Sequence, residues 1–161
     1  MVRAPALLAV VLGVTAAGCG GPVVDVTQGL EILDVRTGWF DAGIVDGKNK
    51  LVPSMTFKLR NVSDQPLVAL RVNALFRRAG EADEWGSSFL TVAGSEGLSP
   101  GVTSDDIVAR SALGYTGTEP RQEMLKNAHF VDATVEVFAK YGSQQWKLVG
   151  KHAVARELLT P

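Results

Sequence analysis

The stretch that decides the fold is Met55-Thr56-Phe57-Lys58-Leu59-Arg60, followed at once by Asn61-Val62-Ser63-Asp64-Gln65-Pro66. Apolar and polar residues alternate in the first half. Because successive side chains of a strand point to opposite faces, this alternation predicts a strand with one buried face. The second half is rich in residues that favour turns. The sequence therefore predicts a strand that ends at a polar loop.

The same alternation recurs along the chain. The next run places apolar residues on one face and polar residues on the other, which predicts a neighbouring antiparallel strand over 70–77. We expect further strands over 85–93, 107–111, 131–140 and 146–154, the last forming a C-terminal hairpin. One short helix is expected over 119–127, because Pro120 lies near its first turn and Asn127 near its end. About seven short strands with frequent turns predict an all-β sandwich.

The run Phe57 to Leu67, then Leu70-Arg71-Val72 with Phe76 and Gly80, then Leu98-Ser99-Pro100-Gly101, resembles the Ig-like domains of bacterial envelope proteins, typified by the FxLYD group. In that group a strand ends at a polar turn with Asn, and a Leu-x-Pro-Gly turn follows later. The resemblance covers roughly residues 55 to 110 and implies a single Ig-like antiparallel β-sandwich. Its motifs encode turns, so they bear on the fold rather than on the function.

The N-terminal segment has the three parts of an export signal. Arg3 is positive, Ala6 to Val14 is an apolar run, and small residues precede Cys19, the only cysteine. The run of roughly nine residues is shorter than the 20 or so that a spanning helix needs. This arrangement resembles a bacterial lipoprotein signal. The resemblance implies cleavage between Gly18 and Cys19, a diacylglycerol on the Cys19 thiol, and a palmitate or similar acyl chain as an optional addition on the new α-amine.

Three segments follow from these observations: a signal peptide over 1–18, a lipidated cysteine with its tether over 19–28, and the β-sandwich over 29–161. The tether begins Gly20-Gly21-Pro22, which keeps the domain close to the bilayer. In well-studied lipoproteins an acidic residue after the cysteine retains the protein at the inner membrane, so Gly20 favours the outer membrane. The alternatives are an ordinary secretory signal with an accidental cysteine, or an uncleaved, buried apolar segment.

Charge and cysteine content exclude several classes. The 16 basic and 17 acidic side chains give a net charge of −1, and removal of Arg3 with the signal makes it about −2. With no basic block, the sequence predicts neither nucleic-acid binding nor electrostatic capture by anionic lipid. A lone cysteine cannot form an intramolecular disulfide, so the core alone must stabilise the domain.

The residues that carry chemistry form no motif. His129 and His152 are the only histidines, and a metal site would need them to meet a carboxylate such as Asp105, Asp106 or Asp132. Their spacing gives no sign of such a site. The segment 46–50 lacks the acids of a calcium loop, and no serine stands in Gly-x-Ser-x-Gly. We therefore predict no metal, no catalytic residues and no cofactor other than the covalent lipid.

Some apolar residues are out of phase with the alternation. Leu75 lies among Arg71, Asn73 and Arg77, and Phe138 lies between Glu136 and Lys140. Trp39 and Phe40 are a further aromatic pair in a Gly-bounded segment. One interpretation is that loops, the helix or strand bends bury them. The other is that they form a surface for a protein partner, which we take as the candidate partner surface.

The leading functional hypothesis is a non-enzymatic, exported, lipid-anchored binding or scaffold module that faces the periplasm or the exterior. It would be an accessory subunit of an envelope or membrane protein complex. The alternative is a carrier of a lipid or small apolar ligand, which requires an apolar cavity of roughly 300 Å³ or more. A filled core and a flat apolar patch favour the scaffold. An enzyme, the third class, would require both histidines and a carboxylate in one pocket.

Overall fold

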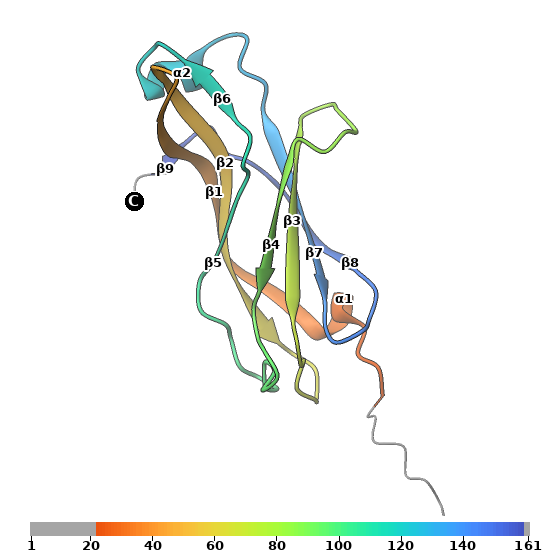
Figure 1. Ribbon diagram of the computed structural model, residues 1–161. Coiled ribbons are helices and arrows are strands. Elements are labelled where there is room, and N and C mark those ends of the chain that lie inside the picture. Colours follow the sequence, from red (N-terminus) through yellow and green to blue (C-terminus); the bar gives the residue numbers. More distant parts are fainter. Residues whose placement is uncertain (1–21, 160–161) are drawn as a thin grey trace, which may run out of the picture.

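The computed structural model describes residues 22–159 and shows two β-sheets packed face to face (Figure 1). The first sheet contains β1 (Leu30–Val45), β2 (Lys48–Asn61), β5 (Ile107–Arg110), β6 (Tyr115–Gly117) and β9 (Leu158–Leu159). Its order is β5-β2-β1-β9, with β6 also paired to β2. The second sheet has the order β4-β3-β7-β8, formed by Gly86–Thr91, Arg71–Arg78, Ala133–Lys140 and Lys147–Ala153. The expected all-β sandwich is confirmed.

Two short helices lie at opposite ends of the sandwich (Figure 1). The first, α1 (Val26–Gly29), precedes β1 at the end where the chain enters the domain. The second, α2 (Arg121–Lys126), lies within the helix expected over 119–127. The first three residues of α1 overlap the end of the segment expected as a tether, 19–28.

Strand β2 carries the deciding stretch. Met55, Phe57 and Leu59 are fully buried between the sheets, as their alternation predicted. The strand ends at Asn61, whose buried side chain organises the turn. Its Nδ2 donates to the carbonyl oxygens of Gln65 and Leu98 at 2.9 and 2.7 Å, and its Oδ1 accepts from the backbone N–H of Ser63 at 2.9 Å.

Strand β1 was not expected, although it has 16 residues. Its alternation is interrupted twice, where the pairing with β2 shifts register between Leu33 and Arg36 and between Asp41 and Ile44. Asp34 has φ 52° and Gly43 has φ 85°, so the backbone leaves the extended conformation near both shifts. With β1, the described residues contain nine strands rather than about seven.

The sandwich is not wholly antiparallel. Strand β9 pairs with β1 in parallel, placing Trp39 beside Leu158 and Phe40 beside Leu159. The backbone N–H of Trp39 also donates to the carbonyl of Glu157 at 2.7 Å. The C-terminal segment therefore completes the sheet at the edge of β1.

Candidate binding surface

The end of the sandwich near α1 is where the chain enters the domain. Gly18 and Cys19, the expected cleavage and lipidation positions, lie outside the described residues. The chain is attached to the sandwich from Pro22, whose carbonyl accepts from the Gln65 side chain. Two residues later, the Val24 N–H donates to Tyr141 Oη at 2.6 Å.

Trp39 does not belong to any surface, which corrects its place in the candidate partner surface. Its side chain is fully buried. The ring packs edge-on against Phe130 with centroids 4.6 Å apart, and it also contacts Tyr115 and Trp85 at 5.6 and 6.0 Å. Trp39 lies on the inner face of β1 and therefore points toward the other three rings. Together the four rings fill the core at the α2 end.

Phe40 lies on the opposite face of β1, since neighbouring residues of a strand alternate. It is half-buried on the outer face of the five-stranded sheet. The guanidinium carbon of Arg110 stands 3.6 Å from the centre of its ring, a cation–π contact. Phe40 is thus covered by its own sheet and lies on a different sheet from Leu75 and Phe138.

Leu75 and Phe138 do lie together, on the outer face of the four-stranded sheet. Both are half-buried. In the pairing of β3 with β7, Phe138 stands opposite Asn73, and Leu75 stands opposite Glu136. The structure therefore brings these two expected residues to one face and separates them from Trp39 and Phe40.

Two more exposed apolar side chains extend this face. Phe89 on β4 also pairs with Asn73, and Leu148 on β8 pairs with Phe138. Phe89 is 68% exposed and Leu148 is 47% exposed. The four residues form a line across all four strands, which we call the apolar row: Phe89, Asn73, Phe138 and Leu148. The carbonyl oxygen of the Asn73 side chain is buried and has no hydrogen-bond partner among the described residues.

Phe89 and Leu148 were missed because the sequence did not assign them to a face. The pairing of β7 with β8 shifts by one residue. Neighbouring residues Val137 and Phe138 of β7 stand opposite Gly150 and Leu148 of β8, which are two positions apart. The shift turns Leu148 to the outer face and His152, opposite buried Val135, to the inner one. A bulge of this kind breaks the alternation on which parity depends. For Phe89, the local sequence of β4 does not indicate which strand β4 pairs with.

Basic side chains flank the apolar row. In the register of β3 with β7, Arg71 stands opposite Lys140 on the side toward α1. Arg77 and Lys151 lie on the far side. The strands contribute one carboxylate to this face, Glu136. It bonds Lys151 Nζ at 3.0 Å and Arg77 Nε at 3.3 Å. The hydrogen bond from Lys151, with help from Arg77, holds the pKa of Glu136 below its ordinary value.

The row has a hollow at the edge nearer α1. The hollow has a volume of about 430 Å³ and is lined chiefly by Arg71, Lys140, Phe89 and Trp146. Trp146 packs edge-on against Phe89 with centroids 6.1 Å apart, and Lys140 Nζ lies 5.2 Å from the Trp146 ring centre. Within residues 22–159, neither Arg71 nor Lys140 forms an ion pair.

The outer face of the five-stranded sheet differs in charge. Lys58 Nζ lies 3.1 Å from Asp34 and 3.7 Å from Asp106. Arg36 pairs with Glu157 at 3.6 Å. Lys58 and Arg36 therefore have carboxylates beside them, whereas Arg110 is stacked on Phe40.

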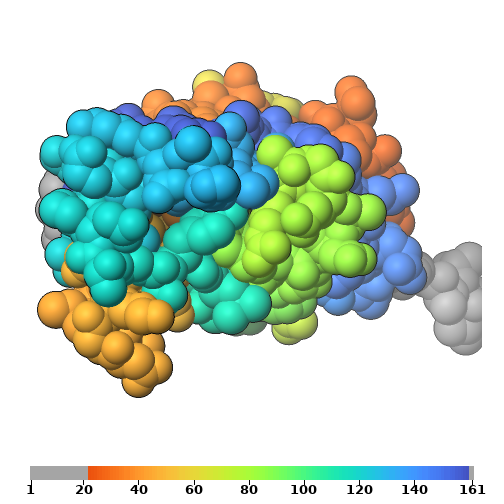
Figure 2. Space-filling view, turned by 90° about the horizontal axis from the view of Figure 1, so that it is seen from above, coloured from red at the N-terminus to blue at the C-terminus, as the bar shows by residue number. Residues whose placement is uncertain are grey.

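A second exposed apolar site lies at the tip of the β1–β2 hairpin. Figure 2 shows this hairpin as a lobe that projects from the body. Ile44 and Val45 at its tip are 70% and 40% exposed, and Asp46 and Gly47 turn the chain with positive φ. Arg121 of α2 pairs with Asp41 at the base of the lobe, which lowers the pKa of that carboxyl. The site is small, and no aromatic side chain belongs to it.

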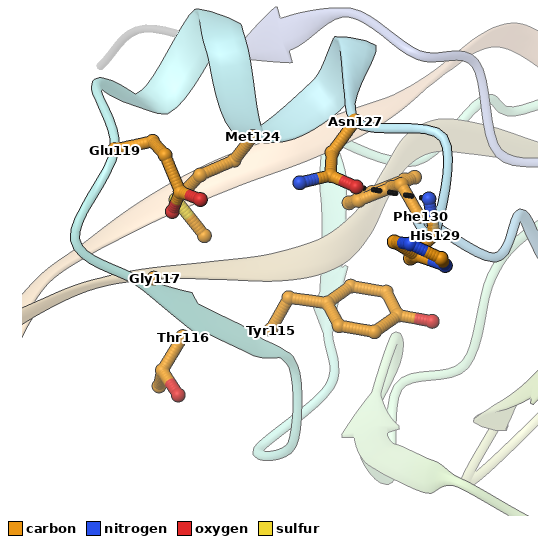
Figure 3. Close-up of a pocket in the computed structure, with 8 residues that line it drawn as sticks. All are labelled: Tyr115, Thr116, Gly117, Glu119, Met124, Asn127, His129 and Phe130. Carbon is orange, nitrogen blue, oxygen red and sulfur yellow. Dashed lines mark hydrogen bonds between the residues drawn. The ribbon is translucent and has the colours of Figure 1, made fainter.

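A pocket of about 210 Å³ lies between β6 and α2 (Figure 3). Tyr115, Met124 and Phe130 supply its apolar side chains. Its polar groups include Glu119 and His129, which lie on opposite sides of the pocket in Figure 3. The backbone N–H of His129 donates to the Asn127 side chain at 2.9 Å. Between residues 22 and 159, no ion pair joins the His129 imidazole to a carboxylate.

The two histidines are not brought together with a carboxylate. His129 is exposed beside α2, whereas His152 is half-buried within β8. In the part of the chain that the structure describes, no cluster of three or more His, Cys, Asp or Glu side chains is arranged to hold a metal ion. Nor does any helix between residues 22 and 159 have the length and apolar character to cross a bilayer.

No protein-family model and no curated protein matches the chain. A solved structure, the X-ray structure of Northeast Structural Genomics Consortium target SoR45, is similar to it at 13% sequence identity with a TM-score of 0.46. The similarity covers 81% of this chain and 89% of the other. Nothing about function is carried over from a likeness at this level.

Proposed function

We propose that this protein is a non-enzymatic, lipid-anchored binding or scaffold module of the bacterial cell envelope, an accessory subunit of an envelope or membrane protein complex. The observation that carries the proposal is the apolar row on the outer face of the four-stranded sheet. Its two exposed members, Phe89 and Leu148, are 68% and 47% exposed.

The solvent side of an antiparallel sheet is ordinarily polar. A row with apolar side chains on three of its four strands is therefore a departure from this rule. A protein-binding surface accounts for it, because buried aromatic side chains contribute most of the binding energy of an interface. Phe89 and Trp146 supply two such rings at one end of the row. Phe138, which the sequence indicated, belongs to the row, and Leu75, also indicated by the sequence, widens the same surface.

The N-terminal signal supports the anchored half of the proposal. Acyl chains on Cys19 contribute about 0.8 kcal/mol for each buried methylene, and two chains give stable anchoring. Because Pro22 is already attached to the sandwich, the domain stays near the bilayer and is concentrated next to membrane-embedded partners. Gly20 after the cysteine favours the outer membrane, with the domain facing the periplasm or the exterior.

The core supports a scaffold over a carrier of lipid or apolar ligand. Large side chains fill the space between the sheets, among them Trp39, Phe57 and Phe76, all fully buried. The hollow of about 430 Å³ beside the row exceeds the roughly 300 Å³ at which sites for small-molecule ligands begin, but Arg71 and Lys140 contribute to its lining, so its wall is not that of an apolar ligand cavity.

The anchor is tested by Cys19→Ser, with Gly21→Ser as the matched control that keeps the thiol. We expect Cys19→Ser to leave the membrane fraction and to lose incorporation of labelled fatty acid, while Gly21→Ser retains both. Membrane residence of Cys19→Ser together with an unlabelled native protein would contradict lipidation.

The binding surface is tested by Phe89→Ser combined with Leu148→Ser. The matched control is Leu113→Ser combined with Val108→Ser, which removes two exposed apolar side chains away from the row; these are 54% and 41% exposed. After gentle detergent solubilisation of native membranes, the first pair should lose a co-purifying partner and the control should keep it. Thermal unfolding should change little in both, since the side chains are exposed. Equal loss of partner in both pairs would remove the row as the binding surface.

A further inference from the structure

The charges around the apolar row indicate the chemistry of its partner. We propose that the outer face of the four-stranded sheet binds an acidic segment of a protein, whose apolar side chains cover Phe89 and Leu148 while its carboxylates meet the flanking arginines and lysines. This inference rests on the proposed function, because it names the kind of partner that the same surface takes.

Strand pairing places four cations on this face. Arg71 pairs with Lys140, and Arg77 and Lys151 lie on the other side of the row. Glu136 is the carboxylate that the strands add, and it bonds both Lys151 and Arg77. The whole chain carries a net charge of −1. Positive charge is therefore gathered on this face by the fold, although the sequence shows no basic block.

The arrangement is that of a protein interface. The row supplies an apolar centre, and the cations stand along both of its sides. Interfaces commonly have an apolar core with a polar, charged rim, and complementary charge at the rim selects the partner and speeds association. A partner with acidic residues on either side of an apolar stretch matches this pattern. A basic partner would meet like charge on both sides.

The hollow next to the row is suited to a carboxylate. Arg71 and Lys140 line it, and neither forms an ion pair within residues 22–159. Phe89 and Trp146 line it as well. An arginine binds a carboxylate through two parallel hydrogen bonds, which gives direction as well as charge. The hollow can therefore hold an acidic side chain while the aromatic rings contact its methylene groups.

Anionic lipid would satisfy the charge but fits the shape less well. Binding at a bilayer surface buries an apolar face about 5 to 10 Å deep among headgroups and acyl chains. On this face Phe138, Leu75 and Trp146 are half-buried, so Phe89 and Leu148 are the apolar side chains that project. A surface with two projecting apolar side chains, a hollow and a charged rim is better matched by another packed protein surface.

The test places a photo-crosslinking amino acid at Leu148 in the full-length, membrane-resident protein and irradiates native membranes. Mass spectrometry then identifies the attached molecule. The charge variant is Arg71→Glu with Lys140→Glu. Its control is Lys48→Glu with Arg60→Glu, which makes the same change of net charge at two exposed positions of the other sheet.

We expect the crosslinked molecule to be a peptide with an excess of Asp and Glu around the attachment point. Its yield should fall at least about tenfold in the charge variant and stay within about twofold of the native yield in the control. High salt should lower the yield as well, because rim charges are screened.

Three results would overturn the inference: attachment to phospholipid, attachment to a neutral or basic peptide, or equal losses in the charge variant and its control. Failure of the proposed function looks different. If a protein is crosslinked and its yield depends on Phe89 but not on the cations, the proposed binding function stands, whereas the proposed acidic partner is wrong. If no protein is crosslinked, and the protein with both Phe89→Ser and Leu148→Ser behaves like the native one, the protein is not a binding module.

Discussion

Asn61 donates a hydrogen bond from its side-chain Nδ2 to the carbonyl oxygen of Leu98 at 2.7 Å, across 37 positions of sequence. The bond joins the loop that follows β2 to the turn at Leu98-Ser99-Pro100-Gly101. Backbone bonds between Leu67 and Leu98 run alongside it at 3.0 and 3.1 Å. The two turn motifs are thus parts of one connected structure.

Replacing Asn61 by alanine should destabilise the domain strongly. The side chain is fully buried, and its loss removes its hydrogen bonds to the carbonyls of Gln65 and Leu98 together with the acceptor for the Ser63 backbone N–H. We expect the free energy of unfolding in urea to fall by about 2 to 4 kcal/mol. Asn127→Ala, at an exposed position with one side-chain hydrogen bond, is the control and should cost less than about 1 kcal/mol. Similar losses for both would show that the buried network is not what stabilises the turn.

Trp39 and Phe40 are neighbours in sequence but should behave differently. Trp39→Ala removes a fully buried ring from the aromatic cluster at the α2 end and should lower the free energy of unfolding by about 3 to 5 kcal/mol. Phe40→Ala removes a half-buried ring that covers the outer face, so its cost should be clearly smaller. Chemical denaturation of both variants checks this, and the reverse order would place Trp39 at a surface after all.

Glu136 should make stability depend on pH. Hydrogen bonds from Lys151 and Arg77 lower its pKa in the folded protein, so its ionised form stabilises the fold above the ordinary pKa of 4.5. That contribution is lost as pH falls through the lower folded-state pKa. Glu136→Gln should therefore reduce the free energy of unfolding by about 1 kcal/mol at pH 7, and the difference from the native protein should shrink below pH 4 or so.

Unfolding by urea at pH 7 and at pH 3 supplies the measurement. A difference for Glu136→Gln that is the same at both pH values would exclude the ion-paired carboxylate as its source.

Asn73→Val should raise stability. The side-chain carbonyl of Asn73 is buried in the middle of the apolar row without a hydrogen-bond partner, and valine is better suited to a strand. We expect a gain of up to about 1 kcal/mol in the free energy of unfolding. If the polar atom contributes to binding, the same variant should bind its partner more weakly. A loss of stability would show that the amide has a partner in solution.

Strands in which apolar and polar residues alternate regularly could be predicted from the sequence. A strand with interrupted alternation could not. The faces of β2 and β3 could be assigned from residues 55–60 and 70–77 because buried and exposed positions strictly alternate there. Strand β1 escaped prediction since register shifts near Asp34 and Gly43 break its pattern. The short helix α2 was predicted from Pro120 and Asn127, both of which flank it in the structure.

The candidate surface was predictable in part for the same reason. Leu75 and Phe138 stood out as apolar residues in the polar phase of regular strands, and both lie on the outer face of one sheet. Phe89 and Leu148 depend on long-range pairing and on the bulge in β8, which local sequence does not reveal. The order of the strands likewise decides which cations share this face: Arg71, Lys140, Arg77 and Lys151.

The parallel pairing of β9 with β1 also sets an order of folding. Strand β1 lies near the start of the described chain and β9 at its end, and the Ala155 N–H donates to the Thr37 side chain across 118 positions. Until the last strand arrives, β1 presents a free edge with unpaired backbone groups, which other chains can pair with. Contacts this distant in sequence form slowly. Aggregation of folding intermediates should therefore begin at β1, and truncation of β9 should prolong that vulnerable interval.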